Sequence, residues 1–289
     1  MRRQDPLVEV APGVHVATSV VYATTSTVVV GDGGTCLVVD PGVTADELDG
    51  LGRACADRGW RPVAVWSTHG HWDHRLDGPV LRGVPRFAVP RPPGRAGSDE
   101  RARLAAERDA DDELARVLSE RPGDRAAPIA PVPRAAPLAR VPEPLRASLT
   151  GPWAGLDLAG WRGPTILVLT HRAHSPDSSA LLVPAAGVLV AGDLLSDVEI
   201  PLLDEDAADP VADHRAALAA LASTHAALVV PGHGRPGDDL AARVARDRAY
   251  LDALTADVRS ADAGPHDARL SCAWQRATHD RQRALARRS

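Results

Sequence analysis

The sequence predicts an α/β fold in which two sheets pack face to face and helices cover their outer sides. Two observations predict it: short runs rich in β-branched residues occur in both halves of the 289-residue chain, and helical patterns lie between them. Apolar residues make up 44% of the sequence, which is enough to fill a core of this kind.

The first third of the chain predicts a sheet followed by a helix. Strands are expected at 7–10, 14–21, 26–32, 35–40 and 62–67. Gly33 and Gly34 predict a hairpin turn between the third and the fourth of these strands. Residues 44–59 predict a helix, because Thr44 can cap its first turn and Glu47 follows three residues later.

The middle of the chain has a different composition. Residues 98–121 predict a charged helix with a narrow apolar stripe. Residues 122–152 contain eight prolines, which predicts irregular chain without helix or strand. This segment is either a spacer or a lid over an active site. We expect a main domain at 1–257 that carries 98–152 as an insertion, followed by a C-terminal helix within 258–289.

Regular structure is predicted again in the second half. Strands are expected at 165–170, 179–184, 187–193 and, running into a loop, 226–234. Ala185, Ala186 and Gly187 predict a hairpin between the second and third of them. Helices are expected at 209–223, 237–260 and 266–287. Asp209 can cap the first of these helices, with Pro210 at its first position.

Charge and composition exclude several classes of protein. The net charge of −5 argues against a nucleic-acid partner, and no apolar run approaches the length of a membrane span. The first ten residues lack the apolar segment of a secretory signal. Three scattered cysteines make no disulfide framework, so we expect a reducing, cytoplasmic setting.

One short stretch concentrates side chains that bind metals. Between Trp66 and Asp77 the sequence is WSTHGHWDHRLD, which places four such residues within six positions: His69, His71, Asp73 and His74. The stretch directly follows the strand predicted at 62–67. We therefore expect these side chains on a loop at the end of that strand.

Three more candidates follow predicted strands in the second half, each beside small residues that allow a sharp turn. They are His174, Asp193 and His233. Neutral imidazoles and carboxylates suit zinc, with bonds of about 2.0–2.2 Å. Seven such groups are too many for one tetrahedral ion, but they suit two ions about 3.5–4 Å apart that share a carboxylate and a hydroxide.

The motifs together resemble the metallo-β-lactamase superfamily of metal-dependent hydrolases. The resemblance rests on THGHWDH at 68–74, AHSPDSS at 173–179, AGD at 191–193 and PGHG at 231–234, with VVDPG at 38–42 ahead of them. Their order agrees over about residues 7–257. The resemblance implies a four-layer αββα sandwich, here with a helical C-terminal extension, and its metal motifs are similar to those of glyoxalase II.

The resemblance also implies a role for each candidate. His69, His71 and His174 would hold one metal ion, whereas Asp73, His74 and His233 would hold a second, and Asp193 would bridge the two. Asp40 would orient a ligand histidine through its other ring nitrogen. The implied cofactor is a pair of divalent ions, with zinc favoured and iron or manganese as alternatives.

The sequence departs from the family pattern near the metal motifs. Ala173 and Asp177 stand where relatives usually have glycine, and Trp72 fills a position that is usually small. We therefore expect Trp72 and Asp177 to shape the substrate pocket. His171 is an alternative to His174 as a ligand. The remaining histidines match no ligand motif: His15, His214, His225, His266 and His279.

These residues predict a hydrolase that acts on a small molecule. Asp73 and Asp193, with a metal-bound hydroxide, are the candidate catalytic groups, and an ester, thioester or lactone is the expected substrate. A β-lactam fits less well, because antibiotic-cleaving relatives generally lack an aspartate like Asp193 or use a cysteine ligand. Three alternatives remain: a phosphodiesterase, an iron-dependent oxidoreductase similar to persulfide dioxygenases, and a binding protein with a vestigial site.

Overall fold

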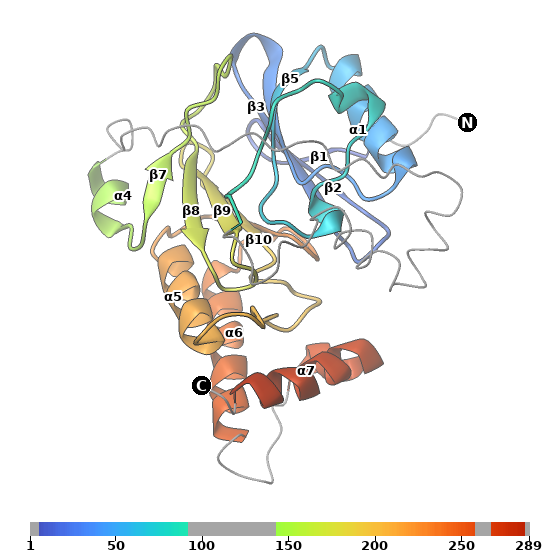
Figure 1. The fold of residues 1–289 in the computed structure, drawn as a ribbon. Coiled ribbons are helices and arrows are strands. Elements are labelled where there is room, and N and C mark those ends of the chain that lie inside the picture. The colour runs from blue at the N-terminus through green and yellow to red at the C-terminus, as the bar shows by residue number, and fades with distance from the viewer. Residues whose placement is uncertain (1–5, 92–142, 258–266, 287–289) are drawn as a thin grey trace.

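The computed structural model describes residues 6–91, 143–257 and 267–286. Two sheets form its centre (Figure 1). The first has the strand order β1–β2–β3–β4–β5–β6, with β1 Val8–Ala11, β2 Val14–Thr18, β3 Thr25–Val30, β4 Thr35–Val39, β5 Arg61–Trp66 and β6 Arg86–Phe87. The second has the order β11–β10–β9–β8–β7, with β7 Trp153–Gly155, β8 Leu167–His171, β9 Ser178–Val183, β10 Val188–Gly192 and β11 Leu228–Pro231.

Alternation along the strands creates three apolar layers. In β3, Val28 points to the layer shared with helix α1 (Ala45–Asp57), and Val29 points to the layer between the sheets. In β9, Leu181 points to the inter-sheet layer, and Leu182 points to the layer under the helices. Because both faces of these strands are buried, their sequences are continuous apolar runs.

Helices cover the outer faces of both sheets, as Figure 1 shows. Helix α1 covers the first sheet, whereas α5 (Pro210–Ala222) and α6 (Leu240–Asp257) cover the second. Helix α7 (Ala273–Ala286) follows a 3₁₀ turn at Ala268–Ser271 and contacts α6, where the Gln282 amide donates to the Tyr250 hydroxyl at 2.9 Å. The predicted four-layer αββα sandwich with a helical C-terminal region is confirmed.

The local signals in the sequence act as expected. The Thr44 side chain accepts from the Glu47 N–H at 3.2 Å, and the Glu47 carboxylate accepts from the Thr44 N–H at 3.0 Å. The Asp209 side chain caps α5 by accepting from the Ala212 N–H at 2.9 Å. Both predicted hairpins form, between β3 and β4 and between β9 and β10.

One expectation about the middle of the chain is wrong. Helix α4, Glu143–Ser148, lies inside the segment 122–152 that was expected to contain no element. Pro144 is tolerated because it stands in the first turn, where a backbone N–H has no intrahelical acceptor. The helix expected at 98–121 and the rest of 122–142 lie outside the described residues. The short edge strands β6 and β7 were not predicted.

Hydrogen bonds join the two sheets along one edge. The Trp66 indole N–H donates to the Ser179 hydroxyl at 3.1 Å, and the Ser179 N–H donates to the Thr68 carbonyl at 2.7 Å. A further bond joins the start of β3 to the loop after β11, where the Thr25 N–H donates to the Gly232 carbonyl at 2.7 Å. The loops that follow β5, β8, β10 and β11 therefore meet at this edge. Within the ranges the structure describes, no helix has the length and apolar character needed to cross a membrane.

Candidate metal centre

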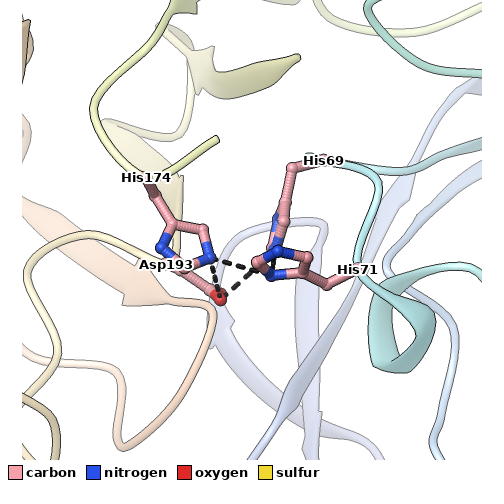
Figure 2. Close-up of side chains that lie close together, drawn as sticks. All are labelled: His69, His71, His174 and Asp193. Carbon is pink, nitrogen blue, oxygen red and sulfur yellow. Dashed lines mark hydrogen bonds and ion pairs between the residues drawn. The ribbon is translucent and has the colours of Figure 1, made fainter. Parts of the chain in front are cut away.

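The seven predicted ligand candidates all meet at the edge where the sheets are joined. They form two groups, and within each group the potential ligand atoms lie within 4.8 Å of one another. The first group is His69, His71, His174 and Asp193, and the second is Asp73, His74 and His233. Figure 2 shows the first group, in which two histidines from the loop after β5 face His174 and Asp193 from the second sheet.

The first group brings three imidazole nitrogens and one carboxylate oxygen together. His71 Nδ1 lies 3.0 Å from His69 Nε2 and 2.9 Å from His174 Nε2. Asp193 Oδ2 lies 3.3 Å from both of those Nε2 atoms. All four potential ligand atoms therefore point at one small volume (Figure 2).

The second group adjoins the first through Asp193. Asp73 Oδ2 lies 3.3 Å from His74 Nε2 and 3.4 Å from His233 Nε2. Asp193 Oδ1 lies 3.2 Å from the same His74 nitrogen, and Asp193 Oδ2 lies 3.3 Å from the His233 nitrogen. Asp193 thus stands between the groups, with an oxygen near each.

These contacts fit metal ions better than hydrogen bonds alone. His71 Nδ1 faces two other imidazole nitrogens, yet a single N–H can lie in only one of those contacts. His74 Nε2 and Asp193 Oδ1 are buried 3.2 Å apart, yet neither makes a hydrogen bond among the described residues, which is costly unless a cation satisfies them. Ligand atoms of a tetrahedral ion with bonds of about 2.0–2.2 Å lie roughly 3.3–3.6 Å apart, close to the separations found here.

Asp40 supports the second group from behind. Its backbone has a φ of 48°, a left-handed conformation that aspartate tolerates better than most residues. Its carboxylate accepts from the Thr68 N–H at 2.8 Å and from the Thr68 hydroxyl at 2.7 Å, and its Oδ2 lies 3.0 Å from His74 Nδ1. The contact with Nδ1 is at an ion-pair distance and is not a hydrogen bond, but a carboxylate so placed favours the ring orientation that leaves Nε2 facing the centre.

Three other histidines also have a partner for the nitrogen that points away from the centre. His233 Nδ1 lies 3.2 Å from the Tyr22 carbonyl, and His174 Nδ1 lies 3.3 Å from the Leu202 carbonyl. His69 Nδ1 lies 3.2 Å from the Thr68 hydroxyl, whose own proton goes to Asp40. Each acceptor favours a proton on Nδ1 and presents Nε2 to the centre.

The ligand candidates shift one another's pKa values. Burial raises the pKa of Asp193, but His233, His74 and His69 outweigh it and hold that pKa well below its usual range. Burial and the neighbouring imidazoles of His69 and His174 lower the pKa of His71 well below its ordinary value. The carboxylate of Asp193 is thus kept ionised and His71 is kept neutral. At His74, His174 and His233, in contrast, burial lowers the pKa but the nearby carboxylates outweigh it and raise the pKa, so these imidazoles hold protons that a metal ion would have to replace.

The first glycine of PGHG, Gly232, packs closely against Asp193. A Cβ built on Gly232 would overlap the Asp193 carboxylate oxygen Oδ1 and the Gly192 backbone. No side chain fits there without moving Asp193. The small residues that flank the ligand candidates therefore make room for the carboxylate as well as allowing the chain to turn.

The remaining predicted site residues lie in other places. Trp72 is only 8% exposed and belongs to the apolar layer between the first sheet and α1, so it is a core residue. Asp177 is buried and accepts from the Ser175 hydroxyl at 2.7 Å. His171 is not part of either group, and its Nδ1 accepts from the Ala173 N–H at 3.3 Å. His174 therefore holds the position for which His171 was the alternative.

Three of the described histidines without a ligand motif serve other contacts. His214 lies 3.4 Å from the Ala173 carbonyl, His279 lies 3.1 Å from the Tyr250 hydroxyl, and the His15 ring packs on Trp60. His225 is exposed at the end of α5, and His266 lies outside the described residues. None of the four described histidines belongs to either ligand group.

A pocket of about 370 Å³ opens beside the first group. Its lining includes His71 and His174, the segment 202–206, and Trp274 and Arg281 of α7. Trp274 is half exposed, which is unusual for so large an apolar side chain. Sequence reasoning did not connect α7 with the site, because a single tryptophan in a charged helix carries no such signal.

Two further charged residues near the centre were also missed. Arg91 lines the pocket, and its Nη1 lies 4.0 Å from the Asp177 carboxylate. Burial raises the pKa of Glu199, and that carboxyl also feels the charges of His233 and Asp193. Neither residue stands in a motif, so only the fold brings them to the site.

Comparisons with known proteins agree with this geometry. The family model described as the metallo-β-lactamase superfamily matches residues 20–233. A metallo-β-lactamase family protein from Thermus thermophilus has a similar structure, with a TM-score of 0.62 and 20% identity over 97% of this chain and 92% of that chain. A β-lactamase domain protein from Burkholderia ambifaria gives 0.57 and 22%, over 97% and 84%.

A metallo-β-lactamase from Hirschia baltica also matches, with a TM-score of 0.50 and 17% identity over 85% of this chain and 96% of that chain. At these identities the structural matches show the shared fold alone. No curated protein matches the sequence. The family model covers most of the chain and spans all seven ligand candidates, and the chain therefore belongs to the metallo-β-lactamase superfamily.

Proposed function

We propose that this protein is a hydrolase with two metal ions that acts on a small ester, thioester or lactone. The observation that carries the proposal is the position of Asp193, whose two carboxylate oxygens lie 3.2–3.3 Å from histidine nitrogens of both ligand groups. A carboxylate between two complete groups suits a pair of ions better than one ion. Zinc is favoured by the mixture of imidazole and carboxylate ligands, with iron or manganese as alternatives.

Each residue of the centre has a defined task in this proposal. His69, His71 and His174 would hold one ion, Asp73, His74 and His233 would hold the other, and Asp193 would contact both. When bound, two divalent ions supply a nucleophilic hydroxide at neutral pH and stabilise the oxygen that gains charge in hydrolysis. Asp40 orients His74, and the buried surroundings keep bulk water from competing for the ligands.

The pocket supports a small-molecule substrate. A volume of about 370 Å³ is at the lower end of the range for small-ligand sites. Its lining combines apolar side chains, such as Leu202 and Trp274, with the cations Arg91 and Arg281 and with three acidic residues at 204–206. The net charge of −5 gives no support for a nucleic-acid substrate.

The second ligand group separates this proposal from its main rival. An iron-dependent oxidoreductase of the same fold would need one metal ion only, and Asp73, His74 and His233 would then have no shared purpose. Their ligand atoms nevertheless lie within 4.8 Å of one another. Cys36 and Cys55 are buried and not joined in a disulfide, which is consistent with the proposed cytoplasmic setting.

Metal quantification beside a substrate panel tests the proposal. We expect about two ions per chain and turnover of chromogenic esters, thioesters or lactones that is lost on chelation and restored by Zn²⁺. Turnover of phosphodiesters alone would make the protein a phosphodiesterase. One iron per chain with thiol-dependent oxygen uptake would make it an oxidoreductase, and bound metal without any turnover would leave a binding protein.

A further inference from the structure

The loops that leave β10 and β11 carry Asp193 and His233, and one buried arginine touches both. Arg243 lies in α6 and is 4% exposed. Its Nη1 donates to the Leu195 carbonyl at 2.8 Å, and its Nη2 donates to the Arg235 carbonyl at 2.9 Å. Each of these carbonyls stands two residues beyond a member of the metal centre.

The rest of the Arg243 guanidinium is also engaged. Its Nε donates to Asp239 at 2.6 Å, which fixes the plane of the group. A Cβ on Gly237 would approach Nη2 to 2.7 Å, so the chain leaves room for the arginine by having no side chain there. A planar fork of this kind can hold two carbonyls and a carboxylate at once, whereas lysine offers a single ammonium.

The loop after Asp193 needs support because its backbone is unusual. Leu195 has a φ of 61°, a left-handed conformation that bulky residues rarely adopt. The Ser196 hydroxyl in the same loop donates to the His233 carbonyl at 2.8 Å. The two ligand loops are therefore joined directly as well as through Arg243.

A second buried arginine holds the far end of the same loop. Arg269 Nη1 donates to the Ser196 carbonyl at 3.0 Å and to the Glu199 carbonyl at 2.7 Å. Its charge is balanced by Asp247 and Asp267, each at 2.7 Å. Arg269 bonds to carbonyls of the Asp193 loop but to none of the His233 loop. Of these two arginines, Arg243 is therefore the one that links the two loops.

We propose that Arg243 is a positioning residue that fixes the distance between Asp193 and His233 and so sets the affinity of the second metal position. This inference rests on the proposed two-metal centre. The effect falls mainly on the second position, because His233 serves that position alone. Asp193 is shared, and at the first position it stands beside His69, His71 and His174, which come from segments that Arg243 does not touch. Asp193 and His233, in contrast, both follow strands whose loops it holds.

Cobalt binding to the metal-free protein tests the proposal without any substrate. Visible absorption and calorimetric titration with Co²⁺ give one affinity for each position. We expect Arg243→Lys to weaken the second Co²⁺ at least tenfold, in line with the roughly 10–100-fold effect of losing an outer hydrogen-bond partner, and to weaken the first, which shares Asp193 only, much less. Arg215→Lys is the matched control, because Arg215 is a half-exposed arginine of α5 paired with Asp252.

Asp239→Asn is a second variant that keeps the arginine and removes the carboxylate that orients it. Asp239 is 43% exposed at the side chain, so the change does not disturb the core. We expect its effect on the second Co²⁺ to have the same direction and to be about threefold. Equal weakening of both positions, or wild-type affinities in both variants, would overturn the proposal.

The outcomes separate this inference from the proposed function. A wild-type protein that binds two Co²⁺ and hydrolyses nothing refutes the hydrolase and leaves the positioning role standing. A wild-type protein that binds fewer than two ions refutes both. Thermal unfolding of each metal-free variant reports stability separately, and a lower melting temperature with unchanged Co²⁺ affinities would reduce Arg243 to a structural residue.

Discussion

The loop after β5 and the loops after β8, β10 and β11 supply one metal centre in two different ways. Four ligand candidates lie within six consecutive positions of the first loop, from His69 to His74. The other three, His174, Asp193 and His233, arrive singly, each after a different strand of the second sheet. A compact cluster is oriented largely by its own backbone turn, whereas single residues on separate loops depend on what packs behind them.

The supports differ accordingly. The first loop ends in a short 3₁₀ turn, Trp72–His74, and its main outside partner is Asp40. The second set is held by side chains of distant helices, among them Arg243 for two of the loops and His214 beside the third. Because of this difference, we expect substitutions far from the metal centre to act mainly on the ligand residues that the second sheet contributes.

The largest effect is expected at the residue that both groups share. Asp193→Ala removes both oxygens that face the histidines, so we expect the loss of at least one ion and a fall in turnover of more than the roughly 10–100-fold that an outer partner is worth. Metal content and hydrolysis rates measure this. Asp252→Ala, at a 69% exposed side chain, is the control. Full metal content with undiminished turnover would show that Asp193 does not bridge.

A smaller and more selective effect is expected behind the first loop. Asp40→Asn keeps a residue that tolerates a φ of 48°, but places an amide near His74 Nδ1, where a carboxylate is needed. We expect the second Co²⁺ to bind about tenfold more weakly, with the first unchanged. Asp57→Asn, at an exposed position of α1, serves as the control. An unchanged second affinity would mean that the His74 ring is oriented without Asp40.

The sequence was most informative where metal-binding side chains stand together in one loop or directly after a clear strand. His69, His71, Asp73 and His74 could be recognised because a single loop carries them, and Asp193 and His233 because small residues flank them after clear strands. The direction of a side chain within the loop was not predictable. Trp72 stands between ligand candidates, yet the 3₁₀ turn points it into the apolar layer against α1.

Features that depend on packing between distant elements were beyond sequence reasoning. Arg243 is one arginine among many in the C-terminal region, and its importance comes from where α6 crosses the ends of β10 and β11. The same holds for Trp274 and Arg281, which reach the pocket because α7 folds back against α6. Helix α4 forms within a proline-rich segment for a local reason, because Pro144 stands in its first turn, where proline is tolerated.

The smallest expected effect concerns the support behind His174 and appears as a pH dependence of stability. His214 is buried in α5, and burial lowers its pKa to about 3. In the unfolded chain the ordinary value is about 6.5. Between these two values the unfolded chain binds a proton that the folded chain does not. Stability therefore falls as pH decreases from about 6.5 towards 3, by up to about 1.36 kcal/mol per pH unit for this group.

His214→Asn removes that proton and keeps a donor for the Ala173 carbonyl, which lies 3.4 Å from His214 Nδ1. We expect the variant to be less stable than wild type at pH 8, because the smaller side chain leaves a cavity, and to lose less stability on acidification. Chemical denaturation of the two metal-free proteins between pH 4 and pH 8 measures the difference. Buried His171, whose pKa is also lowered to about 3, is present in both proteins. Burial is the main cause of that shift and His214 a smaller one, so most of the His171 contribution cancels. Stability curves that stay parallel over the whole range would show that His214 carries no such linkage, and that the loop before His174 is held by packing alone.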